Sequence, residues 1–177
     1  MQVAVVLVVK TSLLFATDWG WWGVEASSRG IVQVVLPQRS PHQVRKQLGS
    51  VESSASLLAE EAARQIQEYL YGRRQRLTVP VDWELISGFA RQILGACTQI
   101  AYGQTVSYSE LARRAGKEGA ARATGQALAT NPVPILVPCH RVVCADGSLG
   151  GFSGGLEMKR RLLELEGRWP LAEADSG

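Results

Sequence analysis

A proline-rich apolar segment at residues 131–144 constrains the fold more than any other part of the chain; its sequence is NPVPILVPCHRVVC. Its three prolines exclude a helix, because proline lacks the amide that an inner helical turn needs and disfavours helical backbone in the residue before it. The segment is therefore predicted to be extended and to hold Cys139 in a fixed position. A cysteine between Pro138 and the pair His140 and Arg141 is a candidate nucleophile, because nearby positive charge favours the thiolate. A packed core cysteine is the simpler alternative.

The residue after this cysteine is a candidate base. Adjacent side chains of an extended segment point to opposite faces, so Cys139 and His140 are not expected to form the direct ion pair of a cysteine peptidase. A water molecule between them would let His140 take the thiol proton, with a carboxylate orienting the imidazole. Spacing alone leaves four downstream candidates for the orienting carboxylate: Asp146, Glu157, Glu164 and Glu166.

Two short helices joined by a glycine-bearing turn are predicted just before this segment. The first begins at Ser107, whose hydroxyl can form a reciprocal capping box with the Glu110 carboxylate, and ends at Gly116. The second spans residues 120–129 and consists almost wholly of small side chains, with Arg122 as its long cation. The pair predicts either a helix-turn-helix or an ordinary helical hairpin. A helix this slender can approach a neighbouring backbone or a narrow groove closely.

The first part of the chain is β-rich. The strands are predicted at residues 3–9, 13–17, 19–26 and 31–36. The turns between them are short, which indicates antiparallel hairpins. Residues 37–54 show no clear period and are predicted to form a loop. A helix follows from Ser56 to Gly72, because apolar side chains recur there every three or four residues.

A further helix is predicted after Asp82, which can cap it, with an apolar stripe that ends at Cys97. We divide the chain before Pro80. Residues 1–79 are expected to form an N-terminal α+β supporting domain. Residues 80–177 are expected to form a mostly helical C-terminal domain that carries the cysteine, so the fold class is α+β.

Composition excludes several classes of protein. The 177 residues are 46% hydrophobic and 20% charged, which excludes a disordered chain. Basic residues number 19 and acidic residues 16, and the net charge of +3 permits nucleic-acid binding without requiring it. Three cysteines form no disulfide framework and indicate a reducing, cytoplasmic location. The apolar run at residues 3–9 ends at Lys10, well short of the roughly 20 residues that span a bilayer, so we expect no membrane segment.

Segment 131–144 closely resembles the active-site signature of the O6-alkylguanine-DNA alkyltransferases, also called methylated-DNA–protein-cysteine methyltransferases. The resemblance continues through YGQTVSY at residues 102–108 and through the loop and helix at residues 147–167. It covers residues 80–169 strongly and the N-terminal part loosely. It implies a ribonuclease H-like N-terminal domain and a winged helix-turn-helix-like C-terminal domain.

The resemblance also implies a mechanism and the residues that carry it. Cys139 matches the alkyl acceptor, whose thiolate takes the alkyl group from O6 of guanine and keeps it as a thioether, so the protein is consumed. His140 resembles the water-mediated base and Glu166 the carboxylate that orients it. Asn131 resembles the asparagine that pins the active-site segment. Tyr108 resembles the residue that rotates the base out of the helix and donates a proton to guanine N3.

The expected partner is double-stranded DNA containing O6-alkylguanine, bound by a monomer from the minor groove without a dissociable cofactor. Arg122 matches the finger that fills the gap left by the extruded base. The other residues expected at the DNA are Thr105, Tyr108, Ala121, Ala123 and Gly125. The residues expected to line the substrate pocket are Arg141, Val142, Phe152, Ser153 and Gly154. Main-chain carbonyls of Cys139 and Val142 would accept from the guanine amino group, and the backbone near Ser153 would donate to O6.

The chain departs from the family pattern at three points. Phe152 stands where many relatives have a tyrosine, so ring stacking survives without the hydroxyl. Ala101 replaces a common proline. The structural zinc of some relatives is not expected, because residues 1–96 contain no cysteine and a single histidine, His42, whereas tetrahedral zinc needs four ligands.

Three other functions compete with this interpretation. A non-catalytic relative would recognise the lesion only, but such proteins replace the acceptor, commonly by tryptophan, and this chain retains Cys139. A transcription regulator would read the major groove, but the helix at residues 120–129 has few side chains that can read bases. A Cys-His hydrolase is opposed by the adjacency of Cys139 and His140.

Overall fold

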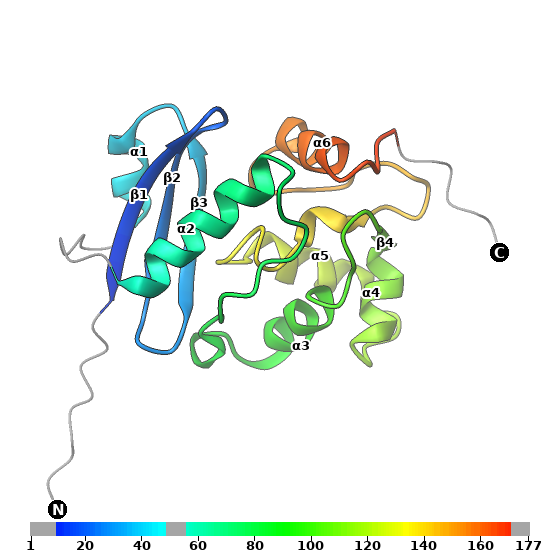
Figure 1. The fold of residues 1–177 in the computed structure, drawn as a ribbon. Coiled ribbons are helices and arrows are strands. Elements are labelled where there is room, and N and C mark those ends of the chain that lie inside the picture. Colours follow the sequence, from blue (N-terminus) through cyan, green and yellow to red (C-terminus); the bar gives the residue numbers. More distant parts are fainter. Residues whose placement is uncertain (1–9, 49–55, 171–177) are drawn as a thin grey trace, which may run out of the picture.

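The computed structural model describes residues 10–48 and 56–170 (Figure 1). The strand predicted at residues 3–9 lies outside the described residues. A small three-stranded sheet with its helices forms one side of the molecule, and four helices with a two-stranded sheet form the other side (Figure 1). This arrangement confirms the predicted α+β class. No helix among the described residues is long and apolar enough to cross a membrane.

The three strands of the first sheet confirm the predicted hairpins. The strands are β1 (Thr11–Thr17), β2 (Gly20–Ala26) and β3 (Ile31–Gln38), in the antiparallel order β1-β2-β3. Alternating residues face opposite sides of the sheet. Trp22 and Val24 join the main core beneath α2 (Leu57–Leu70), whereas Val35 packs with α1 on the other face. The predicted helix from Ser56 is confirmed as α2, and the Ser56 hydroxyl accepts from the Ala59 amide.

The loop predicted for residues 37–54 is partly wrong, because α1 (Pro41–Gln47) forms within it. Ser40 caps this helix by accepting from the Gln43 amide, and Pro41 occupies the first turn, where a missing amide costs nothing. The helix is too short to show a clear apolar period. It packs so closely on β2 that a Cβ added at Gly23 would lie 2.6 Å from a Val44 methyl carbon.

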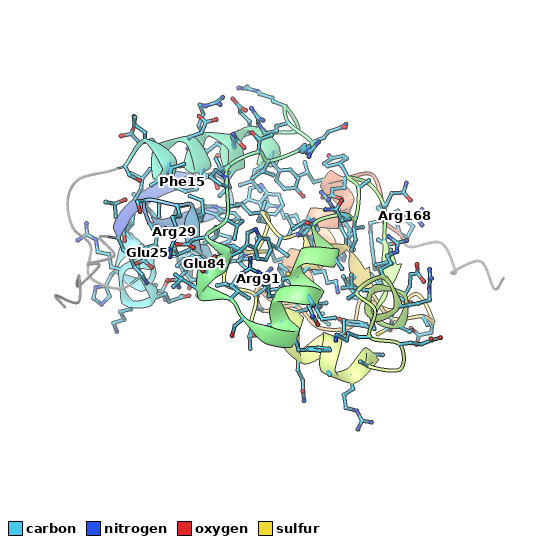
Figure 2. All side chains as sticks on the ribbon, turned by 90° about the horizontal axis from the view of Figure 1, so that it is seen from below. Phe15, Glu25, Arg29, Glu84, Arg91 and Arg168 are labelled. Carbon is cyan, nitrogen blue, oxygen red and sulfur yellow. The ribbon has the colours of Figure 1, made fainter. Side chains whose placement is uncertain are left out.

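The single helix predicted from Asp82 is also wrong. Asp82 caps only a short 3-10 turn, η1 (Trp83–Leu85), and α3 (Gly88–Cys97) begins separately. Gly88 has a φ of 58°, a left-handed conformation that breaks the helical path. While one oxygen of the Asp82 carboxylate caps η1, the other accepts from the Ser27 hydroxyl at 2.6 Å and from Arg29 Nε at 3.3 Å. Figure 2 shows Arg29 and Glu84 in this region, away from Arg168.

The remaining elements surround the proline-rich segment. They are β4 (Val106–Ser107), α4 (Tyr108–Arg114), α5 (Ala121–Ala129), η2 (Cys139–Arg141), β5 (Val142–Val143) and α6 (Leu156–Leu165). β4 pairs in parallel with β5, which places the start of α4 beside the backbone that follows Cys139. The predicted helix pair is confirmed as α4 and α5. The capping box is only half formed, because Glu110 N–H donates to Ser107 Oγ while the Glu110 carboxylate turns to Arg113 and Arg114.

The two sides of the molecule share one core and are joined by backbone hydrogen bonds. The Val34 amide of β3 donates to the Pro132 carbonyl at 2.8 Å, and the Ile31 amide donates to the Pro80 carbonyl at 2.8 Å. The main cluster of buried apolar side chains runs from Trp22 in β2 to Leu162 in α6. The sheet therefore supports the cysteine-bearing segment directly.

Candidate active site

The proline-rich segment is not helical, as predicted, but it is also not extended over most of its length: it turns between Val133 and Val137, whose amide donates to the Val133 carbonyl, and is extended at Val142 and Val143. Cys139–Arg141 form the 3-10 turn η2, so the prediction of an extended segment is wrong both at this turn and at the earlier one. Within the earlier turn, Ile135 has a φ of 74°, which is strained for a β-branched residue and is sustained by the surrounding packing. Among the described residues no hydrogen bond joins the Cys139 and His140 side chains.

The Asn131 side chain bridges the turn of this segment between Val133 and Cys139. Its Nδ2 donates to the Val137 carbonyl at 3.1 Å and to Cys139 Sγ at 3.2 Å, while its Oδ1 accepts from the Val133 amide at 3.1 Å. Asn131 and Cys139 are both buried. The amide therefore fixes the thiol and supplies a hydrogen bond that favours its charged form.

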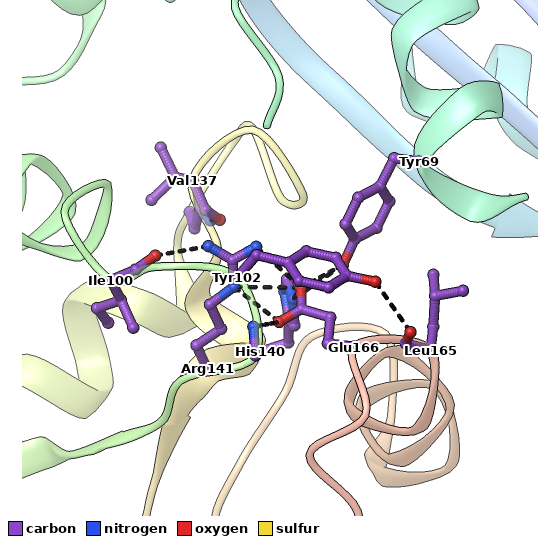
Figure 3. Close-up of polar contacts among 10 residues, drawn as sticks. Tyr69, Ile100, Tyr102, Val137, His140, Arg141, Leu165 and Glu166 are labelled. Atoms are coloured by element: carbon purple, nitrogen blue, oxygen red, sulfur yellow. Dashed lines mark hydrogen bonds and ion pairs between the residues drawn. The ribbon is translucent and has the colours of Figure 1, made fainter. Parts of the chain in front are cut away.

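A buried polar network joins Glu166 to His140, the residue that follows Cys139 (Figure 3). His140 Nε2 lies 2.9 Å from Glu166 Oε1, and Arg141 Nη2 donates to the same oxygen at 2.9 Å. Arg141 also donates to the Ile100 carbonyl at 2.6 Å. Tyr69, from α2, donates its hydroxyl hydrogen to Glu166 Oε1 at 2.5 Å and lies 3.2 Å from His140 Nε2. Of the four carboxylates that spacing left open, Glu166 is the one beside His140.

The network sets the charge of its members. Burial alone would raise the pKa of Glu166, but the hydrogen bonds and charges of His140 and Arg141 outweigh it and lower this pKa to about 2. Burial lowers the pKa of His140, against the opposing effect of Glu166. Burial raises the pKa of Tyr69, and the Glu166 charge adds to the rise. At neutral pH the site therefore holds a carboxylate, a neutral imidazole and a protonated phenol.

The expectation that neighbouring cations favour the Cys139 thiolate needs correction. Burial raises the pKa of the Cys139 thiol, and the Asn131 hydrogen bond and the Lys159 charge only partly oppose this. Arg141, the adjacent cation, is committed to Glu166. The cation that acts on the thiol therefore comes from α6, and its contribution could not be inferred from the residues next to Cys139.

Lys159 is a completely buried cation that the sequence analysis missed. Its Nζ donates to the Val142 carbonyl at 2.5 Å, to the Gly151 carbonyl at 3.1 Å and to the Leu149 carbonyl. Burial lowers its pKa to about 8, although the nearby cysteines oppose this shift. A signal was present in the sequence, because Lys159 precedes Leu162 and Leu163 at the spacing of one buried helix face.

A cavity of about 170 Å³ opens over the thiol. Its lining residues are Tyr108, Gly125, Leu128, Ala129, Cys139, Gly151, Phe152 and Ser153. The walls come from α4, α5 and the loop before α6. Tyr108 is held there by the Gly151 amide, which donates to its hydroxyl oxygen at 3.1 Å. The Phe152 ring meets the His140 ring edge-on, with centroids 6.5 Å apart.

The structure brings together only part of the predicted pocket. Phe152 and Ser153 line the cavity, whereas Arg141, Val142 and Gly154 are not among its lining residues. Arg141 is held by Glu166, and the Val142 carbonyl accepts from Lys159. Gly154 lies against Leu36 of β3 and lines a neighbouring groove.

The predicted DNA-facing residues lie on α5, at the first residue of α4 (Tyr108) and at Thr105, just before β4. Arg122 and Ala123 are exposed on α5, and Ala121 and Gly125 are partly exposed. Thr105 is partly buried and accepts from Arg168 Nε at 3.4 Å. A slender exposed helix therefore borders the cavity that contains Cys139.

Comparison with known proteins places this site in a family. A family model described as "6-O-methylguanine DNA methyltransferase, DNA binding domain" matches residues 88–168. The inducible methylated-DNA–protein-cysteine methyltransferase of Bacillus subtilis is 40% identical over 163 residues, which cover 89% of each chain. The chain belongs to the methylated-DNA–protein-cysteine methyltransferase family. The resemblance noted in the sequence is thereby confirmed.

Other members of the methylated-DNA–protein-cysteine methyltransferase family agree in sequence and fold. The human methyltransferase is 51% identical over 80 residues, which cover 45% of this chain and 39% of the human protein. The crystal structure of Mycobacterium tuberculosis O6-methylguanine methyltransferase has a TM-score of 0.74 at 31% identity and covers 93% of this chain and 97% of its own. A structure of Mycobacterium tuberculosis OGT in complex with DNA has a TM-score of 0.71 at 30% identity, covering 88% of this chain and 92% of its own.

Besides Lys159, the sequence analysis did not identify Tyr69 as a residue of the active site. It lies on the inner face of α2, where its ring counted only as one position of an apolar stripe. Nothing in that stripe distinguishes a tyrosine that packs from one whose hydroxyl reaches Glu166, because the partner lies 97 residues away. Tertiary structure alone reveals the contact.

Proposed function

We propose that this protein repairs O6-alkylguanine, chiefly O6-methylguanine, in duplex DNA by moving the alkyl group irreversibly to Cys139. The observation that carries the proposal is the position of Cys139. Cys139 lines a small cavity that α5 borders, and the next residue, His140, is buried against the Glu166 carboxylate. Family membership supports the same activity.

The reaction is a displacement at the alkyl carbon. The Cys139 proton passes through a water molecule to His140, and the thiolate attacks the carbon bound to O6. A carbon–sulfur bond forms, the carbon–oxygen bond breaks, and the electron pair stays on the guanine oxygen. Tyr108 donates a proton to guanine N3 as this charge develops. The proton that His140 took from Cys139 then passes through water to the Tyr108 phenolate, so both side chains end neutral. A thioether is a poor leaving group, so each molecule reacts once.

The alkyl carbon is out of reach while guanine is stacked in the duplex. We therefore include a base-flipping step, which costs a few kcal/mol and less for a poorly paired, damaged base. The small exposed side chains of α5 suit the narrow minor groove, and the exposed Arg122 can fill the gap in the stack. A related protein from Mycobacterium tuberculosis that forms a complex with DNA supports this partner.

The cavity suits a flipped guanine with a small adduct. The ring of Phe152 can stack on the base, and the backbone near Ser153 can donate to O6. The carbonyls of Cys139 and Val142 can accept from the guanine amino group. The Val142 carbonyl also accepts from Lys159 Nζ. Methyl groups fit a cavity of about 170 Å³ better than long chains do.

The finer architecture belongs to the same proposal. We assign residues 1–79 to a ribonuclease H-like supporting domain and residues 80–177 to a winged helix-turn-helix-like domain, supported by the antiparallel sheet and by the α4–α5 pair beside β4 and β5. We expect a monomer without a dissociable cofactor. The cytoplasmic location stays a prediction from the free cysteines.

The decisive experiment mixes the protein with a duplex that carries one O6-methylguanine and measures the intact mass, with peptide mapping and Cys139→Ala as the control. We expect one added methylene per chain, located on Cys139, and guanine restored in stoichiometric amounts. Tight lesion binding with an unchanged mass would favour a recognition-only protein. Repeated turnover on esters or peptides would favour a hydrolase.

A further inference from the structure

Tyr69 brings a side chain of the sheet-bearing half into the network that joins Glu166 to His140. It lies on α2, is completely buried, and contacts both members of the base–carboxylate pair (Figure 3). We infer that Tyr69 is a positioning residue: its hydroxyl, together with Glu166, holds the proton of His140 on Nε2 and so keeps the lone pair of Nδ1 free for the Cys139 proton. This inference rests on the proposed function, because it concerns the step that activates the thiol.

The first step of the argument is the direction of the Tyr69 hydroxyl. A phenol has one hydrogen to donate. The Glu166 oxygen 2.5 Å away is a carboxylate acceptor with no hydrogen of its own, because the pKa of Glu166 is lowered to about 2. Tyr69 therefore donates to Glu166, and toward His140 Nε2, at 3.2 Å, it presents only oxygen lone pairs.

The second step concerns the two nitrogens of His140. Nε2 faces two acceptors, Glu166 Oε1 at 2.9 Å and the Tyr69 oxygen at 3.2 Å, so it must carry a hydrogen. Burial lowers the pKa of His140, so the ring is neutral at rest and Nδ1 then carries a lone pair. Nδ1 is buried and has no hydrogen-bond partner among the described residues. It is the ring nitrogen left to receive a proton.

The third step concerns the moment after the proton arrives. The imidazolium donates through Nε2 to the same two oxygens, so no group has to reorient. Tyr69 also lowers the basicity of Glu166 by donating to it, which keeps the Nε2 proton on the ring. The titratable groups that face this ring from neighbouring elements are Tyr69 of α2, Cys139 and Arg141 of η2, Lys159 of α6, and Glu166.

Tyr102 provides a matched control. Its ring meets the Tyr69 ring edge-on at 6.1 Å, and its hydroxyl donates to the Leu165 carbonyl at 2.9 Å. It hydrogen-bonds to neither His140 nor Glu166 among the described residues. Tyr102→Phe therefore removes one nearby hydroxyl but leaves the hydrogen bonds that are proposed to fix the His140 tautomer unchanged.

The experiment compares Tyr69→Phe, Tyr102→Phe and the unchanged full chain in the absence of DNA. Iodoacetamide alkylation of Cys139, followed by peptide mapping across pH, gives the midpoint of thiol reactivity. Nitrogen-15 spectra of the histidines give the tautomer of His140. We expect Tyr69→Phe to raise the midpoint by about one pH unit, a tenfold loss of reactivity at neutral pH, and to populate the Nδ1–H tautomer. Tyr102→Phe should do neither.

Equal effects of the two variants, or an unchanged midpoint and tautomer in Tyr69→Phe, would overturn the inference and leave Tyr69 as a packing residue. Should Tyr69→Phe not fold, the spectrum of the unchanged protein still decides, because a proton on Nδ1 there contradicts the argument. These measurements need no alkylated DNA. A failure of the proposed function appears separately, as a missing methyl transfer by the unchanged protein.

Discussion

Asn131 Nδ2 donates a hydrogen bond to Cys139 Sγ at 3.2 Å while its Oδ1 accepts from the Val133 amide. The hydrogen bond to sulfur opposes the effect of burial, which raises the pKa of the thiol. One amide side chain therefore joins the strained turn of the segment to the reactivity of the cysteine. A change at this position tests both effects at once.

Asn131→Asp should slow alkylation of Cys139 at neutral pH by at least about tenfold, because a carboxylate offers sulfur no hydrogen and adds a repulsive charge beside the thiolate. The measurement is iodoacetamide modification of Cys139 as a function of pH. Gln99→Glu, the same change at an exposed site, is the control. A midpoint that moves equally in both variants would show that only net charge matters.

Glu166→Gln should destabilise the fold by about 3–5 kcal/mol at neutral pH, because it leaves the buried Arg141 without its ionic partner. Urea unfolding gives the free energy directly. Glu157→Gln, an exposed site on α6, should change stability very little. A small effect at Glu166 would mean that Arg141 finds another partner.

The low pKa of Glu166 predicts a pH dependence of stability. Its folded pKa is about 2 and its ordinary value is 4.5, so the unfolded chain binds the proton more readily. The stabilisation is fully present above pH 4.5 and disappears as the pH falls toward 2. Unfolding free energies measured across this window should fall more steeply for the unchanged protein than for Glu166→Gln. Parallel curves would remove Glu166 as the cause.

Lys159→Met should loosen the loop before α6 and destabilise the fold by about 2 kcal/mol or more, because the Val142, Leu149 and Gly151 carbonyls lose a shared donor. Hydrogen exchange around Gly151 should increase, and Cys139 should react more slowly because a nearby cation is gone. Arg160→Met, a partly exposed position on the same helix, serves for comparison. Unchanged exchange near Gly151 would contradict this role.

Arg122→Ala should weaken the base-flipping step without changing the reactivity of the Cys139 thiol. We expect methyl transfer from duplex DNA to fall about tenfold or more, because the exposed finger no longer stabilises the flipped state, while iodoacetamide modification of Cys139 stays unchanged. Arg45→Ala on α1 removes the same charge from the sheet-bearing side of the molecule (Figure 1). Equal losses in both variants would indicate long-range charge attraction instead.

The sequence by itself determined the local structure and the reactive motif. The hairpins, α2, α4 and α5 follow from local turns, periodicity and caps such as Ser56 and Ser107, which act within a few residues, whereas the helix at α6 was expected only from the family resemblance. Pro132, Pro134 and Pro138 exclude an α-helix through the segment before Cys139 by covalent geometry alone. Local signals predicted a long helix after Asp82, and this prediction failed. The Asp82 carboxylate also accepts hydrogen bonds from Ser27 and Arg29, which are distant in sequence.

Only the tertiary structure decided which groups complete the active site. The packing of α6 against η2 decides three features of the site. It places Glu166 beside His140, it pairs Arg141 with Glu166, and it brings Lys159 close to the thiol. Tyr69 reaches Glu166 across 97 residues of chain. Side-chain charge and tautomer are set by burial and by partners in space, and these are properties of packing that sequence spacing does not contain.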